Sequence, residues 1–178
     1  MYMIIDVKIA VRIGFLCFMH MINKKFKIIK SFSREYKMID KMKAIVRQQR
    51  ICVLATVAGH KPYCSLMAYV TDDHCKEIYM VSLKNTQKYD NLLKNPSVSI
   101  MIDTRDKQPR TQTQALTVEG SFCKIANENK IKEIRLKLIE AHPHLQEFMD
   151  HPDAEILCIK VHSFLLLNDL TDAHFVEL

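Results

Sequence analysis

Apolar residues recur along this chain with two different periods. Met38, Met42, Ile45 and Val46 follow a helical spacing, so residues 37–49 are predicted to form an amphipathic helix with one apolar stripe. From residue 51 onward the period changes to two, in runs rich in β-branched and aromatic residues. These runs predict six strands, at 51–57, 62–71, 77–82, 97–104, 114–126 and 155–167.

Two further helices are predicted between these strands. Asn85 or Thr86 can cap a helix that runs to Asn95 and stops at Pro96. Asn127 can cap another, whose apolar positions share one side: Ile131, Ile134, Leu138 and Ala141. The short connections between strands predict antiparallel pairing, and closing the sheet removes its exposed edges. We therefore expect a mainly β fold, a small six-stranded antiparallel barrel with flanking helices.

Residues 1–37 differ in kind from residues 38–178, which we expect to form the folded domain. The first segment holds eight of the 26 basic residues and two of the 20 acidic ones. Its longest apolar run without charge or histidine, 13–19, is far shorter than the roughly 20 residues of a membrane span, and no signal-peptide cleavage site follows. Three interpretations remain: an amphipathic surface helix, an extra helix packed on the domain, or residues added by an upstream start codon, with Met38 or Met42 nearer the working beginning. We favour the last two.

Composition excludes several classes of function. Only three glycines occur, so neither a G-x-G-x-x-G dinucleotide turn nor a G-x-x-x-x-G-K phosphate loop can be present. The net charge of +6 resides entirely in residues 1–37, and the remainder is electrically balanced. A neutral body without a basic stripe gives no electrostatic reason to expect a nucleic-acid ligand.

The cysteines and histidines give no pattern typical of a metal site. The six cysteines never approach C-x-x-C spacing and mostly lie in apolar runs, so we expect reduced, buried thiols in a cytoplasmic protein. His142, His144 and His151 cluster, but Pro143 breaks the helical spacing that a zinc-binding pair needs. We expect no metal.

The junction between strand 77–82 and the next helix carries a candidate anion site. Ser82 ends the strand, and Thr86 and Lys88 lie at the start of the helix. A lysine in the first turn opposes the helix dipole, unless a bound anion reverses the sign of that interaction. A phosphate held by two hydroxyls, an ammonium and free backbone N–H groups is one interpretation. A solvated lysine on a short helix is the other.

The alternation in strand 62–71 predicts two unlike faces. One, expected to face the core, carries Cys64, Leu66, Ala68 and Val70. The other mixes hydroxyl groups with flat or soft apolar groups, as would suit the edge of an aromatic ligand, or it is an ordinary surface strand. Its residues are Tyr63, Ser65, Met67 and Tyr69.

The order of these segments resembles the pyridoxamine 5′-phosphate oxidase-like family of FMN-binding split barrels. The resemblance covers about residues 38–165 and follows ICVLATVAGHKPYCSLMAYVTDD, IYMVSLKNTQKYDNLLKNPSVSIMIDTR and QALTVEGSFCKI. Its most specific part is the strand–turn–helix with a hydroxyl, a threonine and a lysine ahead of N-L-x-x-N-P-x-V. The matching residues are Ser82, Thr86, Lys88, Asn91, Leu92, Asn95, Pro96 and Val98.

The resemblance implies a homodimer with FMN at the subunit interface. Ser65, Leu66 and Met67 would lie along the flavin ring, and Ser82, Thr86 and Lys88 would hold its phosphate. The partner chain would contribute residues that follow Thr104, and the candidates are Arg105, Gln112 and Gln114.

The resemblance also implies an oxidoreductase, in which the flavin accepts a hydride or electrons from a small molecule and a nicotinamide cofactor, NAD(P)H, can serve as reductant. No catalytic acid or base can be named, and Tyr69 and His60 are expected to be structural.

Because the ending NDLTDAHFVEL lacks the arginines of a vitamin B6 substrate motif, B6 oxidation is not expected. The alternatives are a flavin-binding redox module without a substrate and a haem-binding or haem-degrading barrel.

Overall fold

The structure is a computed structural model that describes residues 24–25, 29–30, 35–104, 114–168 and 172–178. It divides into two units, residues 1–40 and residues 41–178. In the first unit the described residues 24–25, 29–30 and 35–40 are helical. None of the helices that the structure describes combines the length and the apolar character needed to cross a membrane.

The second unit is built mainly from strands. It begins with helical residues 41–48, which fall inside the predicted helix 37–49. Three α-helices and one 3-10 turn follow: α2 (Gln87–Lys94), α3 (Glu128–Ala141), η2 (Pro143–Leu145) and α4 (Gln146–Met149). The strands are β1 (Ile51–Ala58), β2 (Lys61–Ala68), β3 (Val70–Thr71), β4 (Glu77–Leu83), β5 (Ser97–Asp103), β6 (Ala115–Cys123), β7 (Ala154–Leu167) and β8 (Ala173–Glu177).

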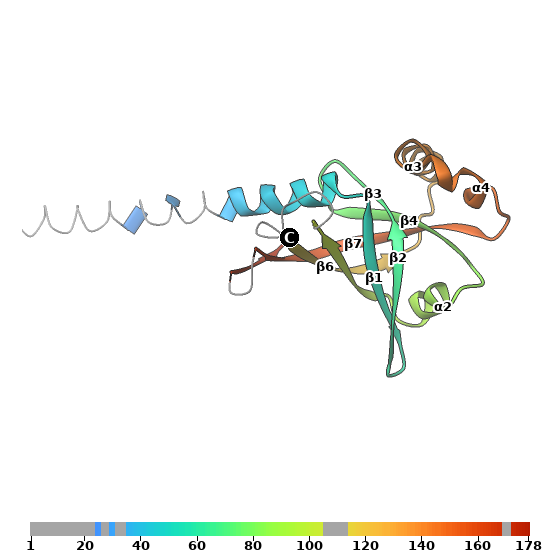
Figure 1. The fold of residues 1–178 in the computed structure, drawn as a ribbon, viewed down its shortest axis with the longest axis horizontal. Coiled ribbons are helices and arrows are strands. Elements are labelled where there is room, and N and C mark those ends of the chain that lie inside the picture. The colour runs from blue at the N-terminus through green and yellow to red at the C-terminus, as the bar shows by residue number, and fades with distance from the viewer. Residues whose placement is uncertain (1–23, 26–28, 31–34, 105–113, 169–171) are drawn as a thin grey trace, which may run out of the picture. The chain divides into compact units, whose positions relative to one another are not determined.

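The sheet closes through one divided strand. Its order is β2-β1-β5-β6-β7-β4-β3, with β8 added on β7, and every pairing is antiparallel. The first and last strands of this order, β2 and β3, are neighbours in the sequence, separated only by Tyr69. Figure 1 shows the sheet curling so that β1, β2 and β4 lie close together. The predicted antiparallel split barrel is thereby confirmed.

The predicted number of strands is corrected from six to eight. The predicted strand 62–71 is divided at Tyr69. Its N–H still donates to the Arg50 carbonyl beside β1 and its hydroxyl donates to the Val46 carbonyl, whereas Val70 and Thr71 pair with β4. β8 lies in the chain's last eleven residues, for which no strand was predicted. Its residues become a strand because β7 offers them a partner, with Phe175 opposite Leu165.

The barrel encloses the main core. Inward-facing side chains on β1, β5, β6 and β7 are fully buried, among them Leu54, Ile100, Leu116 and Phe164. A second apolar cluster lies on the other face of the sheet, beneath α3: Tyr79, Val81, Ile134, Leu138, Met149 and Cys158. Asn127 caps α3 as predicted, accepting from the N–H groups of Asn129 and Lys130. The fold therefore buries apolar side chains on both faces of β4 and β7.

The predicted core face of strand 62–71 is wrong. Met67 and Tyr69 are buried in the barrel, whereas Leu66 is 74% exposed and Cys64 is exposed. The error arose because both faces of this strand carry apolar side chains, so alternation alone does not say which face points inward.

The cysteines and histidines have structural environments. Cys52, Cys75 and Cys158 are buried thiols, as expected, but Cys64 is exposed, and none of the five described cysteines forms a disulfide. The buried His142 ring contacts the Tyr69 carbonyl at 3.0 Å. Within the described ranges, no group of three or more His, Cys, Asp or Glu side chains is placed to hold a metal ion.

Gly120 provides a test of how tightly the strands approach at the bulge between β6 and β7. A Cβ at this position would lie 2.5 Å from the Lys160 carbonyl oxygen and 2.8 Å from Ile159 Cγ2. We expect Gly120→Ala to lower the free energy of unfolding by about 1–3 kcal/mol, measured by urea denaturation. Gly59→Asn is the control, because Gly59 has φ +61 and open space around it, and asparagine tolerates that backbone. Equal stability of the two variants would contradict the close approach.

Candidate functional site

The predicted anion site lies where β4 passes into α2. Ser82 is buried, one residue before the end of β4, and its Oγ lies 3.0 Å from Thr86 Oγ1. Thr86 donates to the Leu83 carbonyl at 2.8 Å, which fixes the turn between strand and helix. The structure thus brings together the two hydroxyl groups that the sequence analysis singled out.

The beginning of α2 lacks a side-chain cap. Thr86 occupies the N-cap position, but its side chain makes no capping hydrogen bond because it is turned toward Leu83 and Ser82. The first N–H groups of a helix lack partners within the helix, and they form the positive end of its dipole. The corner therefore offers backbone donors, and its two hydroxyl groups, which donate within the turn in this structure, would have to rotate to donate to a bound anion.

Lys88 adds a cation to this corner. It lies in the first turn of α2, and partial burial lowers the pKa of its ammonium group because desolvation disfavours the charged form. Among the described residues it forms no ion pair that would offset this cost. A bound anion would supply the missing partner, so the residues fit a phosphate.

A buried polar chain holds α2 against β1. Gln87 donates to Asn91 Oδ1 at 2.8 Å, and Asn91 donates to Thr56 Oγ1 at 3.2 Å. Both Asn91 and Thr56 are buried, as is Leu92 on the same helix. Figure 1 shows α2 beside the lower half of β1 and β2. These contacts fix the position of the helix start. The sequence analysis did not predict that Thr56 supports α2. The available signal was a threonine at an inward-facing position of an otherwise apolar strand.

The β2 residues predicted to lie along a ring belong to a strand that pairs only with β1 and approaches β4 without pairing with it. β3 pairs with β4 through Val70–Tyr79 and Thr71–Ile78. If this register continued, Met67 would lie opposite Ser82, but the ladder stops and β2 pairs only with β1. The barrel is therefore split between β2 and β4, with Ser65, Leu66 and Met67 on one side and Ser82 on the other.

Gln114 lies far from this corner within one chain. Its N–H donates to Thr104 Oγ1 and its side chain to Asn168 Oδ1. It precedes Ala115, which pairs with Leu167, whereas Ser82 pairs with Glu155 near the other end of β7. Twelve residues of β7, which passes the bulge opposite Gly120, separate those two positions, at most roughly 40 Å along the strand at 3.3 Å per residue. Arg105 and Gln112 lie outside the described residues.

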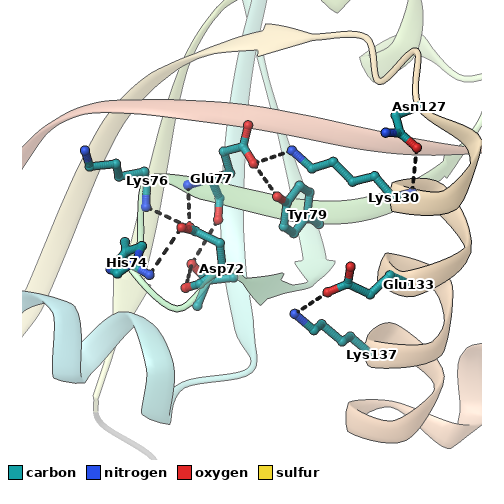
Figure 2. A network of polar contacts seen from close by, with 10 residues as sticks. Asp72, His74, Lys76, Glu77, Tyr79, Asn127, Lys130, Glu133 and Lys137 are labelled. Atoms are coloured by element: carbon teal, nitrogen blue, oxygen red, sulfur yellow. Dashed lines mark hydrogen bonds and ion pairs between the residues drawn. The ribbon is translucent and has the colours of Figure 1, made fainter.

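A second polar cluster was not anticipated from the sequence. The Asp72 carboxylate accepts from the backbone N–H groups of His74, Lys76 and Glu77, which shapes the turn between β3 and β4 (Figure 2). Cys75 in this turn has a left-handed backbone with φ 55. Next to it, Glu77 accepts from Tyr79 and Lys130, so the turn, β4 and α3 are tied together.

This second cluster has the electrostatics of a structural link. Partial burial alone would raise the pKa of Glu77, but the hydrogen bonds from Lys130 and Tyr79 lower it on balance. Burial, followed by the contact with Glu77, raises the pKa of Tyr79. A hollow of about 490 Å³ lies beside the cluster, lined by both acidic and basic side chains. The opposed charges are paired within the protein, so this cluster stabilises the fold.

The chain resembles proteins of known sequence and structure. A sequence profile of the pyridoxamine 5′-phosphate oxidase family matches residues 38–168. No curated protein matches the sequence. Among solved structures, a heme binding protein from Mycobacterium smegmatis superposes with a TM-score of 0.70 at 14% identity, over 78% of this chain and 57% of the other. The chain thus spans little more than half the length of that protein.

Two further structures are matched over nearly their full length. General Stress Protein 26 from Bacillus anthracis has a TM-score of 0.60 at 19% identity, with 79% of this chain and 98% of the other covered. A FAD-binding protein from Mesorhizobium loti has a TM-score of 0.59 at 17% identity, with 71% and 91% covered. At such low sequence identities these structural similarities show only the fold. The profile match shows the family, because it covers most of the sequence. The chain belongs to the pyridoxamine 5′-phosphate oxidase family of split barrels.

Proposed function

We propose that this protein binds FMN in the opening between β2 and β4 and is an oxidoreductase acting on a small molecule. The observation that carries the proposal is the corner at the start of α2. There, two hydroxyl groups 3.0 Å apart adjoin a helix N-terminus and a partly buried lysine without a carboxylate partner. These are the groups that bind a phosphate monoester.

The side chains around the opening have separate roles in this proposal. Ser82, Thr86 and Lys88 hold the phosphate, while Asn91 and Thr56 keep α2 at a fixed distance from β1. Ser65, Leu66 and Met67 line the flavin ring, largely through their backbone groups. The buried Met67 excludes water on that side of the opening.

The flavin would supply the redox chemistry, by accepting a hydride or electrons from a small-molecule substrate or from a nicotinamide cofactor. The chain's own contribution is binding, orientation and exclusion of water. Tyr69 donates its hydroxyl to the Val46 carbonyl inside the fold, so it supports the barrel and is not placed to transfer a proton in the opening.

A homodimer completes the proposed site. The outer face of the sheet carries a continuous row of cross-strand neighbours over six strands: Leu66, Val53, Met101, Thr117, Leu165 and Phe175. Leu66 is 74%, Met101 42% and Phe175 63% exposed. An apolar band of this extent is unusual on a monomer and typical of a protein–protein contact. A second copy of the chain is the partner that we propose.

The dimer also accounts for the residues that follow Thr104. Gln114 cannot reach the phosphate corner of its own chain, because most of β7 lies between them. In the proposal Gln114, with Arg105 and Gln112, approaches the flavin of the partner chain.

A visible absorption spectrum of the purified protein tests the cofactor. We expect the two flavin bands, with a bound molecule that mass spectrometry identifies as FMN, and reconstitution with FMN when the protein is purified colourless. A Soret band would instead favour the haem-binding alternative, which the fold of the Mycobacterium smegmatis protein raises. Bound flavin without turnover of NAD(P)H and an electron acceptor would favour a redox module over an enzyme.

Lys88→Ala tests the phosphate corner. We expect FMN binding to weaken by about 1.5–3 kcal/mol, roughly 10- to 150-fold in Kd, because one charge-assisted contact is lost. Fluorescence titration measures this affinity. Lys94→Ala, which removes a cation from the last turn of the same helix, is the control and should bind FMN normally. An unchanged Kd for Lys88→Ala, or an equal loss in both variants, would remove Lys88 from the site.

Leu66→Asp tests the proposed dimer. A carboxylate at the β2 end of the apolar band would be desolvated on association, so we expect light scattering to report a monomer. Leu136→Asp is the control, because Leu136 is 69% exposed on α3, away from the band. A Leu66→Asp protein that remains dimeric would show that another surface joins the subunits.

A further inference from the structure

Two cysteines face each other directly on neighbouring strands. Cys123 ends β6 and lies opposite Cys158 of β7, and Tyr79 of β4 is the next residue in the same row. Residues paired in this way project their side chains to the same face of a sheet. Here that face is the outer one, beneath α3, where Cys158 packs in the second apolar cluster and Cys123 lies at its edge.

The strand register gives the two cysteines a Cα separation within the range of disulfides, and closing the bond requires their Cβ atoms to draw together from about 5.5 Å to about 4.5 Å or less. Successive residues of a strand point their backbone N–H and C=O groups to alternate sides. Val161 donates its N–H to the Lys76 carbonyl on the β4 side, so Cys158, three residues earlier, points its backbone groups toward β6. Phe122 donates toward the start of β5, to Pro96, so Cys123 turns its polar groups toward β7. The two residues therefore form a hydrogen-bonded antiparallel pair, for which Cα atoms are about 5.5 Å apart. Disulfides span about 4.4–6.8 Å between Cα atoms.

The two thiols differ in their surroundings. Cys158 is 1% exposed, and burial raises the pKa of its thiol, which the hydrogen bond with Cys123 raises further. Cys123 is only half-buried. Cys123 is therefore the more accessible of the two thiols. The Lys130 ammonium interacts electrostatically with both sulfur atoms and is itself held by Glu77 (Figure 2).

We propose that Cys123 and Cys158 form a dithiol–disulfide site that small hydroperoxides oxidise. The Cys123 thiolate attacks the peroxide oxygen, the O–O bond breaks, and a sulfenic acid and one water form after protonation. The Cys158 thiol then attacks the sulfenic sulfur, forming the S–S bond and releasing a second water. Two thiols lose two electrons, and one hydrogen peroxide is reduced to two waters. A thiol reductant reverses the bond by exchange.

This site is independent of the proposed flavin corner. Ser82 and Cys158 lie on opposite faces of the sheet, because Ser82 is one residue from Val81, whose side chain packs with Cys158 beneath α3. Oxidation would join β6 to β7 under α3 without using any residue assigned to FMN. The site can therefore be tested on the full-length protein whether or not it holds flavin.

Peptide mapping of the peroxide-treated protein tests the proposal. After a small molar excess of hydrogen peroxide, we expect the free thiols to fall from the six of the sequence to four, and dithiothreitol to restore them. Trypsin should then release residues 111–124 linked to residues 138–160, each of which contains one cysteine. The linked pair should weigh about 2 Da less than the two reduced peptides together, and the intact chain should keep a monomer's mobility on a non-reducing gel.

Two matched variants decide between this pair and general thiol oxidation. Cys64→Ser removes an exposed thiol whose strand partner is Ala55, and it should still lose two thiols and yield the linked peptide. Cys123→Ser should fold and yield no linked peptide. The proposal is overturned if peroxide leaves Cys123 and Cys158 open to alkylation, or if the linked peptide arises only from a cross-linked dimer. It is also overturned if Cys64→Ser abolishes the link.

Discussion

The fold depends on how one strand divides at Tyr69. The buried tyrosine bonds the Arg50 carbonyl through its N–H and the Val46 carbonyl through its hydroxyl, so β2 stays with β1 while β3 crosses to β4. This closes the barrel at one end and leaves β2 and β4 unpaired beyond it. The unpaired edge at which we propose the cofactor exists because the closing strand does not pair with both neighbours along its whole length.

The candidate site combines a rigid support with an unpaired charge. Asn91 and Thr56 make α2 part of the barrel wall, so its N-terminus is held in one place. Lys88 then lies partly buried without a compensating carboxylate among the described residues. Desolvating a cation opposes folding unless a ligand provides the counter-charge, and this arrangement is typical of a binding site.

The outer face of the sheet has two uses. Beneath α3 it packs a second apolar cluster that includes Cys158. Past the bulge at Gly120, the outer side chains of β6 and β7 belong to the row across six strands in which Leu66, Met101 and Phe175 are exposed. One region of this face is thus covered by the chain's own helix α3, and the other region contacts a second chain in the proposed dimer.

The sequence by itself determined the strand and helix types, the cap at Asn127 and the grouping of Ser82, Thr86 and Lys88, because these depend on neighbours a few residues apart. It could not determine which face of 62–71 is buried, since Leu66 and Met67 are equally apolar and only the curvature of the closed sheet distinguishes them. Nor could it reveal β8, which depends on β7, or the pairing of Cys123 with Cys158 across two strands. Contacts between residues distant in sequence decided these features, because strand register is set by the whole sheet.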